Sequence, residues 1–310
     1  MSNPEPTLIA TSVVRGSQQG ESHGGVYLID THSGEIHQTV DWNTCEIDFA
    51  GRGWDRGLRG IAFHKNEVYV AASDELFVYE PDFRMKRSFR SPYLKHCHEI
   101  QVKDHYLFLI STGFDSILVF DLTKQAFTWA IHISREGQRW VGKHFDPMDF
   151  DGPAPGNVWH LNSVCVDDSG VYVCGLHTEC LLKIGSDFEP RVAVELPNGV
   201  HNGQLFLDGV LFNDTNVDHV RFVRRSGEES AFKIPTYDPE QLTFTGVDDS
   251  KLARQGFGRG LCAIDDRLIA AGSSPSTISI YDLESKERLL MVNFSLDVRN
   301  AIHGLEVWPY

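Results

Sequence analysis

Short runs of apolar residues recur along this chain, and most of them begin with a histidine. The stretch from Trp159 to Val166 opens on His160 and continues as alternating apolar residues, a pattern typical of a buried strand. Five more stretches share this form and are led by Arg59, His98, His201, Arg259 and His303. The pattern predicts six equivalent strands, each with His or Arg at its entrance.

A second recurring unit is a strand that runs into a polar turn. Its copies cover residues 26–31, 76–81, 117–122, 181–186, 219–224 and 278–283. The Asp, Ser, Thr or Gly residues that follow these strands are typical of hairpin turns. With one further strand before and one after each copy, four strands recur over roughly 40 residues, the period of a propeller blade.

The two ends of the chain complete one blade between them. Residues 7–14, 26–30 and 35–42 fit the second, third and fourth strands of a blade, and the missing first strand is found at 300–308. Pairing of the last strand with the first closes the ring and removes exposed sheet edges. We therefore predict an all-β protein, a six-bladed β-propeller of four-stranded antiparallel blades that forms one domain over residues 1–310. Helical periodicity is found only in the stretch 241–254.

Two long insertions, 134–158 and 237–257, interrupt the repeat between a fourth strand and the next first strand. This connection emerges on the face where the His and Arg leaders lie. We expect both insertions to cover that face, since long ordered loops on a rigid scaffold often carry function. Asp115, in a second-to-third strand loop on the same face, is a weaker candidate.

Composition limits the partners and the compartment. The net charge of −15 argues against nucleic acid or an anionic membrane as the main partner, because phosphate binding needs a basic field. We find no signal peptide and no apolar run near the ~20 residues that a membrane helix needs. The six cysteines are scattered without a CxxC pair, which favours free thiols and a cytoplasmic protein.

With these repeats and the ring closure, the chain resembles six-bladed propellers of the NHL-repeat and gluconolactonase-like group. WD40 signatures are absent. The resemblance implies the fold but no specific family. Peptidylglycine amidating lyases and carotenoid oxygenases are similar in using histidine sets within a propeller, whereas gluconolactonase-like enzymes use Glu, Asn and Asp, which do not match here. No catalytic residue is taken from any of these families.

Three of the leading histidines come from neighbouring blades. His98, His160 and His201 should therefore converge on the axis, where three imidazoles suit Zn²⁺, Fe²⁺ or Mn²⁺ and leave a position open for water or substrate. His303, on the opposite blade, is a candidate fourth ligand or an acid/base. A ligand held by His and Arg without metal, or a purely structural channel, are the alternatives.

Several polar residues complete the predicted site. Glu99, Asn162 and Asn202 follow the histidines and are expected to hydrogen-bond to the imidazoles and fix their tautomers. The predicted catalytic residues are His303 and Glu99, and the predicted substrate contacts are Arg59, Arg259, Asn162 and Asn202. The two arginines flank His303 and suit a carboxylate or phosphate.

The function predicted from these residues is that of a metal-dependent enzyme acting on a small, anionic organic molecule. With zinc the reaction would be hydrolysis, elimination or isomerisation, and with iron it would be oxygenation. The alternative is a non-catalytic propeller that binds a small ligand or a protein. Both possibilities remain open at this point.

Overall fold

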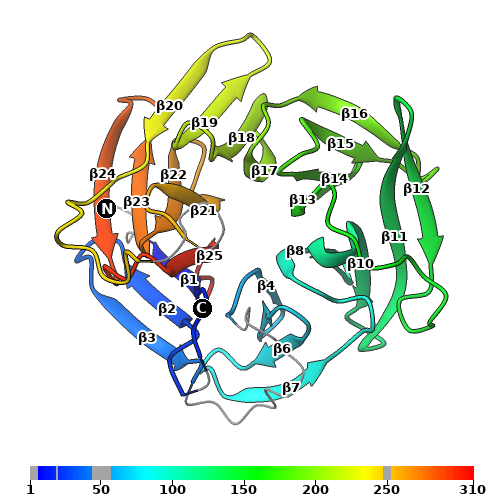
Figure 1. The fold of residues 1–310 in the computed structure, drawn as a ribbon, viewed down its shortest axis with the longest axis horizontal. Coiled ribbons are helices and arrows are strands. Elements are labelled where there is room, and N and C mark those ends of the chain that lie inside the picture. The colour runs from blue at the N-terminus through cyan, green and yellow to red at the C-terminus, as the bar shows by residue number, and fades with distance from the viewer. Residues whose placement is uncertain (1–5, 19, 44–56, 247–252) are drawn as a thin grey trace.

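Six antiparallel sheets form a ring around a central axis (Figure 1). The structure is a computed structural model and describes residues 6–18, 20–43, 57–246 and 253–310. Each sheet is one propeller blade, and its first strand lies innermost. The predicted six-bladed propeller is therefore confirmed.

The strands follow one another outward in each blade. Blade 1 contains β25 (Asn300–Val307), β1 (Thr7–Val14), β2 (Gly25–Asp30) and β3 (Ile36–Asp41). Blade 2 contains β4 (Ile61–His64), β5 (Glu67–Ala71), β6 (Leu76–Tyr79) and β7 (Met85–Phe89). Blade 3 contains β8 (Cys97–Lys103), β9 (Tyr106–Ser111), β10 (Ser116–Asp121), β11 (Ala126–Glu136) and β12 (Arg139–Phe145), with the 3₁₀ turn η1 (Thr112–Phe114) between β9 and β10.

The remaining three blades have four strands each. Blade 4 contains β13 (Leu161–Asp167), β14 (Gly170–Gly175), β15 (Cys180–Ile184) and β16 (Pro190–Glu195). Blade 5 contains β17 (Val200–Phe206), β18 (Gly209–Asp214), β19 (His219–Arg224) and β20 (Glu229–Lys233). Blade 6 contains β21 (Phe257–Ala263), β22 (Leu268–Ser274), β23 (Thr277–Asp282) and β24 (Glu287–Asn293).

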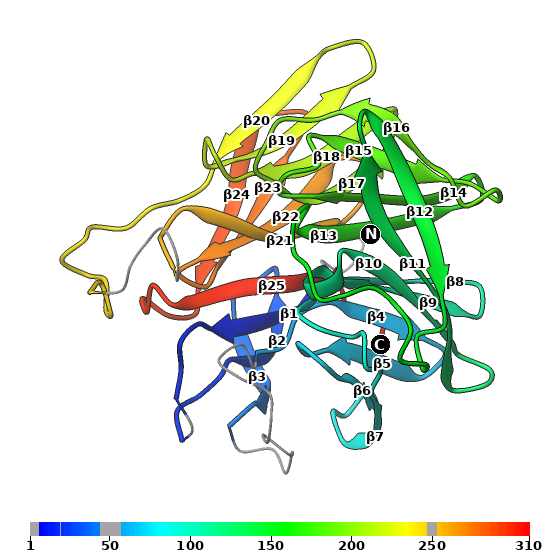
Figure 2. The same ribbon diagram turned by 45° about the vertical axis from the view of Figure 1, so that its right-hand side comes forward.

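The ring closes through β25, as expected. This strand runs antiparallel to β1, with Leu8 opposite Val307 and Val14 opposite Asn300. Figure 2 shows β25 lying beside β1 at the inner side of blade 1. Because β25 carries His303, closure of the ring also brings one of the predicted site residues to the axis.

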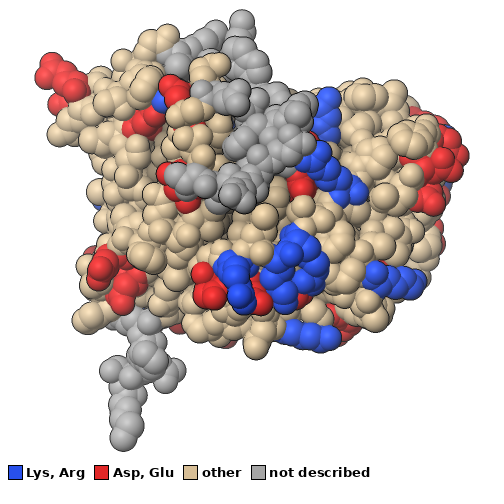
Figure 3. All heavy atoms as spheres, turned by 90° about the horizontal axis from the view of Figure 1, so that it is seen from below, with Lys and Arg blue, Asp and Glu red and all other residues tan. Residues whose placement is uncertain are grey.

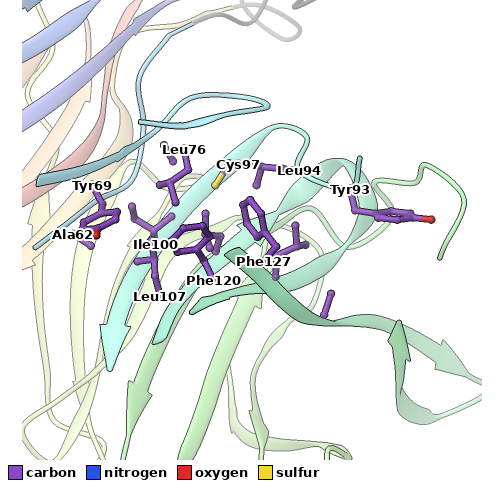
Figure 4. Close-up of a cluster of buried hydrophobic side chains, with 14 of the residues drawn as sticks. Ala62, Tyr69, Leu76, Tyr93, Leu94, Cys97, Ile100, Leu107, Phe120 and Phe127 are labelled. Carbon is purple, nitrogen blue, oxygen red and sulfur yellow. The ribbon is translucent and has the colours of Figure 1, made fainter. Parts of the chain in front are cut away.

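Neighbouring blades pack against each other through apolar side chains. Between blades 2 and 3, Tyr69 and Leu76 lie opposite Ile100 and Phe120, with Cys97 among them (Figure 4). All five side chains are buried. Since the apolar core lies between blades, the inner strand ends can carry polar side chains without interrupting it.

The first predicted insertion is partly regular structure. Instead of one long loop over residues 134–158, β11 extends to Glu136, turns at Gly137 in the left-handed region (φ 60°), and returns as β12. The hairpin adds a fifth strand to blade 3, and only the residues after Phe145 form a loop. In the second insertion, residues 241–246 are not helical. The rest of the predicted helical stretch falls mainly on residues 247–252, outside the described residues.

Charged groups on the outside of the ring are mixed. On the side shown in Figure 3, acidic and basic side chains lie in small neighbouring groups among uncharged residues. On blade 2, for example, Glu67 pairs with Lys86 at 2.7 Å and with Arg87 at 2.8 Å. No helix in the described part of the chain has the length and apolar character needed to cross a membrane.

The cysteines follow the prediction where they are described. Free thiols are found at Cys97, Cys165, Cys174, Cys180 and Cys262. Cys45 lies outside the described residues.

Candidate metal centre

Local irregularities of the sheets lie at or just after most of the residues that lead the inner strands. In blades 3, 4 and 5 the pairing of the first two strands shifts between Cys97 and Ile100, between Leu161 and Ser163, and between His201 and Gln204. The same shift occurs at Arg259 in blade 6 and at His303 in blade 1. A β-bulge turns a side chain out of the regular alternation, so the shifts that contain His98, Arg259 and His303 can turn these leaders toward the axis.

Close contact between inner strands requires glycine beside two of these leaders. A Cβ atom on Gly304 would lie 2.2 Å from the carbonyl oxygen of Arg59, and one on Gly60 would lie 2.5 Å from that of His98. Both positions therefore exclude any side chain. The His-Gly and Arg-Gly pairs of the sequence are explained by this packing around the axis.

His98, His160 and His201 converge as predicted. Their ring centroids are separated by 5.3 Å (His98 to His160), 5.8 Å (His160 to His201) and 6.4 Å (His98 to His201). One ring nitrogen from each residue lies within 4.8 Å of the other two. Three imidazole nitrogens at this spacing can bind one divalent ion after small side-chain adjustments.

Hydrogen bonds fix the orientation of His98. Its Nδ1 lies 2.8 Å from the carbonyl oxygen of His96 and 2.7 Å from Oγ1 of Thr112. The Thr112 hydroxyl in turn donates to the carbonyl oxygen of Leu161 at 2.5 Å. A proton on Nδ1 satisfies both acceptors and leaves the lone pair of Nε2 for a metal ion.

The other two histidines have buried ring nitrogens without a partner among the described residues. These are Nε2 of His160 and both Nδ1 and Nε2 of His201. An unsatisfied buried polar atom costs about 1–3 kcal/mol. A bound metal ion would remove this cost for one nitrogen of each ring.

The turn that carries His160 depends on Asp115. His160 has a left-handed backbone conformation (φ 50°), which a residue with a Cβ atom rarely adopts. The Asp115 carboxylate accepts hydrogen bonds from the backbone N–H groups of Val158 (2.6 Å), Trp159 (3.0 Å) and Leu161 (3.3 Å). One buried side chain thus holds the backbone on both sides of His160.

All of these imidazoles are held neutral. Burial lowers the pKa of His160 to about 3, and the positive charge of Arg259 adds to this effect. Burial also lowers the pKa of His98 and of His201 well below the usual value, with contributions from Arg59 at His98 and from Arg259 at His201. Neutral imidazole is the form that binds metal ions.

His303 lines a small cavity together with His98 and His201, but it has a different partner. Its ring centroid lies 5.6 Å from that of His98, and its Nε2 accepts a hydrogen bond from Nη1 of Arg259 at 2.9 Å. Burial and then Arg259 lower its pKa well below the usual value. Nε2 is thereby occupied, and the roles of His303 as a ligand or as an acid/base remain predictions.

The two arginines occupy the predicted places near the axis. Arg59 is only 2% exposed and donates from Nη1 to the carbonyl oxygen of Cys97 at 3.2 Å. Arg259 packs over the ring of Phe257, 4.7 Å from its centroid. Their guanidinium groups make the axis electropositive, which favours an anion there.

Three predicted residues have other partners than expected. Asn202 donates to the Glu99 carboxylate, and its own oxygen accepts from Nδ2 of Asn213 (3.0 Å) and from the N–H of Gly260 (3.1 Å). Asn162 donates to the carbonyl oxygen of Val200 at 2.8 Å. None of the three makes a hydrogen bond to an imidazole, so the prediction that they fix the tautomers is wrong. For His98 the carbonyl of His96 and the Thr112 hydroxyl have this role.

Glu99 on β8 and Glu306 on β25 place two carboxyl groups on the inner strands. Burial raises the pKa of Glu99 to about 8, against the opposing hydrogen bond from Asn202. Burial and then the neighbouring Glu99 raise the pKa of Glu306 to about 8. Both line a cavity of about 40 Å³ with Asn202 and Gln204. Glu306 was not recognised in the sequence, although it lies three residues after a leader.

Comparison with known proteins shows the fold alone. No protein-family model matches the chain, and no curated protein matches it in sequence. A Bacteroides caccae protein of unknown function has a similar structure, with a TM-score of 0.58 at 11% identity over 97% of this chain and 98% of that chain. A chain of a nidogen/laminin complex gives a TM-score of 0.56 at 9% identity, covering 96% of this chain and 97% of that one.

A virginiamycin B lyase from Staphylococcus aureus, solved with quinupristin, is a more distant match. Its TM-score is 0.47 at 14% identity, with 81% of this chain and 73% of that chain covered. A likeness of this size carries no argument about site or substrate. The chain is a six-bladed β-propeller with a triad of converging histidines at its axis, and no specific family is identified.

Proposed function

We propose that this propeller is a metal-dependent enzyme that acts on a small anionic organic molecule at its axis. In this proposal His98, His160 and His201 bind one divalent ion, either Zn²⁺, Fe²⁺ or Mn²⁺. The observation that carries the proposal is the set of buried, unpartnered nitrogens on His160 and His201, which face a third imidazole whose Nδ1 is already satisfied.

A metal ion at this place would polarise a substrate oxygen or lower the pKa of a bound water. The protein contributes the electrostatic setting. Arg59 and Arg259 favour a carboxylate or phosphate on the substrate. Three protein ligands leave coordination positions open, which is characteristic of catalytic rather than structural zinc sites.

His303 is the residue proposed to move a proton. In the free protein burial lowers the pKa of His303, and the positive charge of Arg259, which donates to its Nε2, lowers it further. An anionic substrate beside Arg259 would offset that positive charge and raise the pKa of His303 toward the range in which imidazole exchanges protons. Substrate binding would thus activate the proposed acid/base.

The free thiols of the described cysteines support a cytoplasmic location within this proposal, since reduced cysteines are typical of that compartment. The reaction class is left open between hydrolysis, elimination or isomerisation with zinc and oxygenation with iron. Substrate contacts are assigned to Arg59, Arg259, Asn162 and Asn202, and an acid/base role to Glu99 in addition to His303.

Calorimetric titration of chelator-treated protein with Zn²⁺, Mn²⁺ and anaerobic Fe²⁺ tests the proposal. We expect one ion per chain and a large loss of affinity in His160→Ala. The matched control is His37→Ala, because His37 is exposed on the outer strand β3. The loaded protein should turn over members of a panel of carboxylate and phosphate esters. Binding that is equal in wild type and His160→Ala would contradict the proposal.

A further inference from the structure

A second cavity lies beside the β11–β12 hairpin of blade 3. It has a volume of about 710 Å³ and is lined by residues of this hairpin and of the loop that follows it, together with Asp115. Ligand cavities commonly measure about 300–1,000 Å³. Among the six sheets formed by the described residues, only that of blade 3 has a fifth strand, so this hairpin is an addition to the repeat and is not needed for the ring.

The cavity is preformed, because the loop is anchored along its length. Ser91 Oγ donates to the Pro147 carbonyl at 2.6 Å, the Gly152 N–H donates to the Tyr93 hydroxyl at 2.6 Å, and the Gly156 N–H donates to the Gly113 carbonyl at 2.9 Å. Asp115 holds the end of the loop at Val158. A site that is already ordered loses less conformational entropy when a ligand binds.

The hairpin supplies basic groups to one wall. Arg135, Lys143, His132 and His144 line the cavity. Arg135 donates to Gln138 at 2.7 Å and packs over Trp140, and neither partner is acidic. Lys143 forms no ion pair with any described residue. Both cationic groups are therefore available to an anionic group of a ligand.

The loop after the hairpin supplies acidic groups. Asp146, Asp149 and Asp151 line the same cavity. Asp146 and Asp149 each use Oδ1 to accept one backbone N–H, at 2.8 Å in both cases. In the described structure no ion pair joins these carboxylates to Arg135 or Lys143. The cavity is thus lined by acidic and basic groups that do not form ion pairs with one another in the described structure.

Other residues of the lining are apolar or aromatic. Ile133, Phe145, Val158 and Trp159 contribute to it. Trp159 also packs edge-on against Trp140, with ring centroids 4.7 Å apart. A molecule that matches this lining carries a negative group, a positive group and an apolar body.

We propose that this cavity binds a zwitterionic small molecule with an apolar body, in the chemical class of amino acids and short peptides. Its carboxylate faces Arg135 and Lys143, and its ammonium group faces the aspartates of the loop. The ligand site does not depend on metal binding at the axis, so it goes beyond the proposed function and can be tested on metal-free protein.

Calorimetry with three probes tests the proposal on chelator-treated protein. The probes are alanyl-phenylalanine, phenylpropionate, which lacks the amine, and phenethylamine, which lacks the carboxylate. We expect the dipeptide to bind roughly tenfold more tightly than either singly charged probe. Lys143→Ala should weaken dipeptide binding by about the same factor and leave phenethylamine binding unchanged, and Asp151→Asn should spare phenylpropionate instead.

Lys233→Ala, which alters an exposed lysine on β20 of blade 5, is the matched control and should bind like wild type. Gly156 lines the cavity, and a Cβ there would meet only the carbonyl oxygen of Ala154 at 3.9 Å, so Gly156→Phe adds a bulky side chain to the cavity lining and should abolish binding of the dipeptide. Equal affinity for all three probes, no binding of the dipeptide at millimolar concentration, or full binding by Gly156→Phe would each overturn the proposal. If Gly156→Phe does not fold, the Lys143→Ala comparison decides.

Discussion

Asp115 holds His160 through the backbone and does not touch its imidazole. The carboxylate accepts N–H groups from Val158, Trp159 and Leu161, the residues on either side of His160. His160 itself is left-handed, at φ 50°, a conformation that costs roughly 1–2 kcal/mol for a residue with a Cβ atom. The position of a proposed metal ligand is thus set by a side chain on the neighbouring blade.

Asp115→Ala should therefore weaken metal binding. We expect a loss of about 10- to 100-fold in Zn²⁺ affinity, the usual cost of removing a group that orients a ligand. Asp115→Asn should lose less Zn²⁺ affinity, because its amide oxygen can still accept some of the backbone hydrogen bonds. Competition with a fluorescent chelator measures both. Asp266→Ala, which changes an exposed aspartate in a hairpin of blade 6, should leave the affinity unchanged. Wild-type affinity in Asp115→Ala would contradict this role.

Thr112 provides a second test from the same turn. Its hydroxyl lies between Nδ1 of His98 and the carbonyl oxygen of Leu161. Thr112→Val keeps the shape but removes both hydrogen bonds, and we expect Zn²⁺ affinity to fall by about tenfold. Thr112→Ser keeps the hydroxyl and should restore most of the affinity. If the valine and serine variants bind Zn²⁺ equally, the hydroxyl does not position His98.

The stability of the metal-free protein should depend on pH in two opposite ways. The folded-state pKa values of His98, His160, His201 and His303 lie below the ordinary 6.5. Below pH 6.5 the unfolded chain binds more protons than the folded one, so the free energy of unfolding falls as pH falls. Glu99 and Glu306 have folded-state pKa values of about 8, raised from 4.5. The stabilisation that these two carboxyl groups provide is lost as pH rises from 4.5 toward 8.

Between pH 4.5 and 6.5 the four histidines change the free energy of unfolding more than the two glutamates do. Above pH 6.5 only the glutamates change it. Urea unfolding should therefore show maximum stability near pH 6.5. Glu306→Gln should reduce the decline between pH 6.5 and 8, and Glu284→Gln, an exposed site, should not. A free energy of unfolding that keeps rising from pH 6.5 to 8 would contradict the burial of these carboxyl groups.

Ring closure can be tested at one buried side chain of β25. Ile302 is fully buried and packs with Ala270 and Ile278 of blade 6 and with Ala10 of blade 1. Ile302→Ala should lower the free energy of unfolding by about 2–5 kcal/mol, measured by urea titration. Leu289→Ala, at a side chain that is 55% exposed, should cost less than about 0.5 kcal/mol. Equal effects would mean that β25 does not close the ring in solution.

The ring and the converging histidines could be predicted because the fold repeats. Equivalent positions of a repeat lie on equivalent strands. Because His98, His160 and His201 occupy the same position in their repeats, the sequence was sufficient to place them together at the axis. The extra strand β12 was missed, although the Gly137 turn between two strand-like segments gave a hairpin signal. Its position after a complete blade made it look like a loop.

The support of the imidazoles could not be predicted in the same way. Thr112 and the backbone around His160 belong to different blades and meet only through the packing of blade 3 against blade 4. Sequence proximity suggested Asn162 and Asn202 instead, but their side chains bond to Val200 and Glu99. The strand pairing shifts at Asn162 and at Asn202, and a β-bulge breaks the regular alternation of side chains, so nearness in sequence was a poor guide.

The central claim is that three imidazoles at the axis bind one metal ion. X-ray absorption spectroscopy of the protein loaded with one equivalent of Zn²⁺ tests it most directly, with metal content measured on the same sample. The account predicts about one zinc per chain with three imidazole nitrogens at about 2.0–2.1 Å, and loss of one imidazole scatterer in His98→Ala, His160→Ala or His201→Ala. Zinc surrounded only by oxygen ligands, or retained unchanged in all three variants, would contradict it.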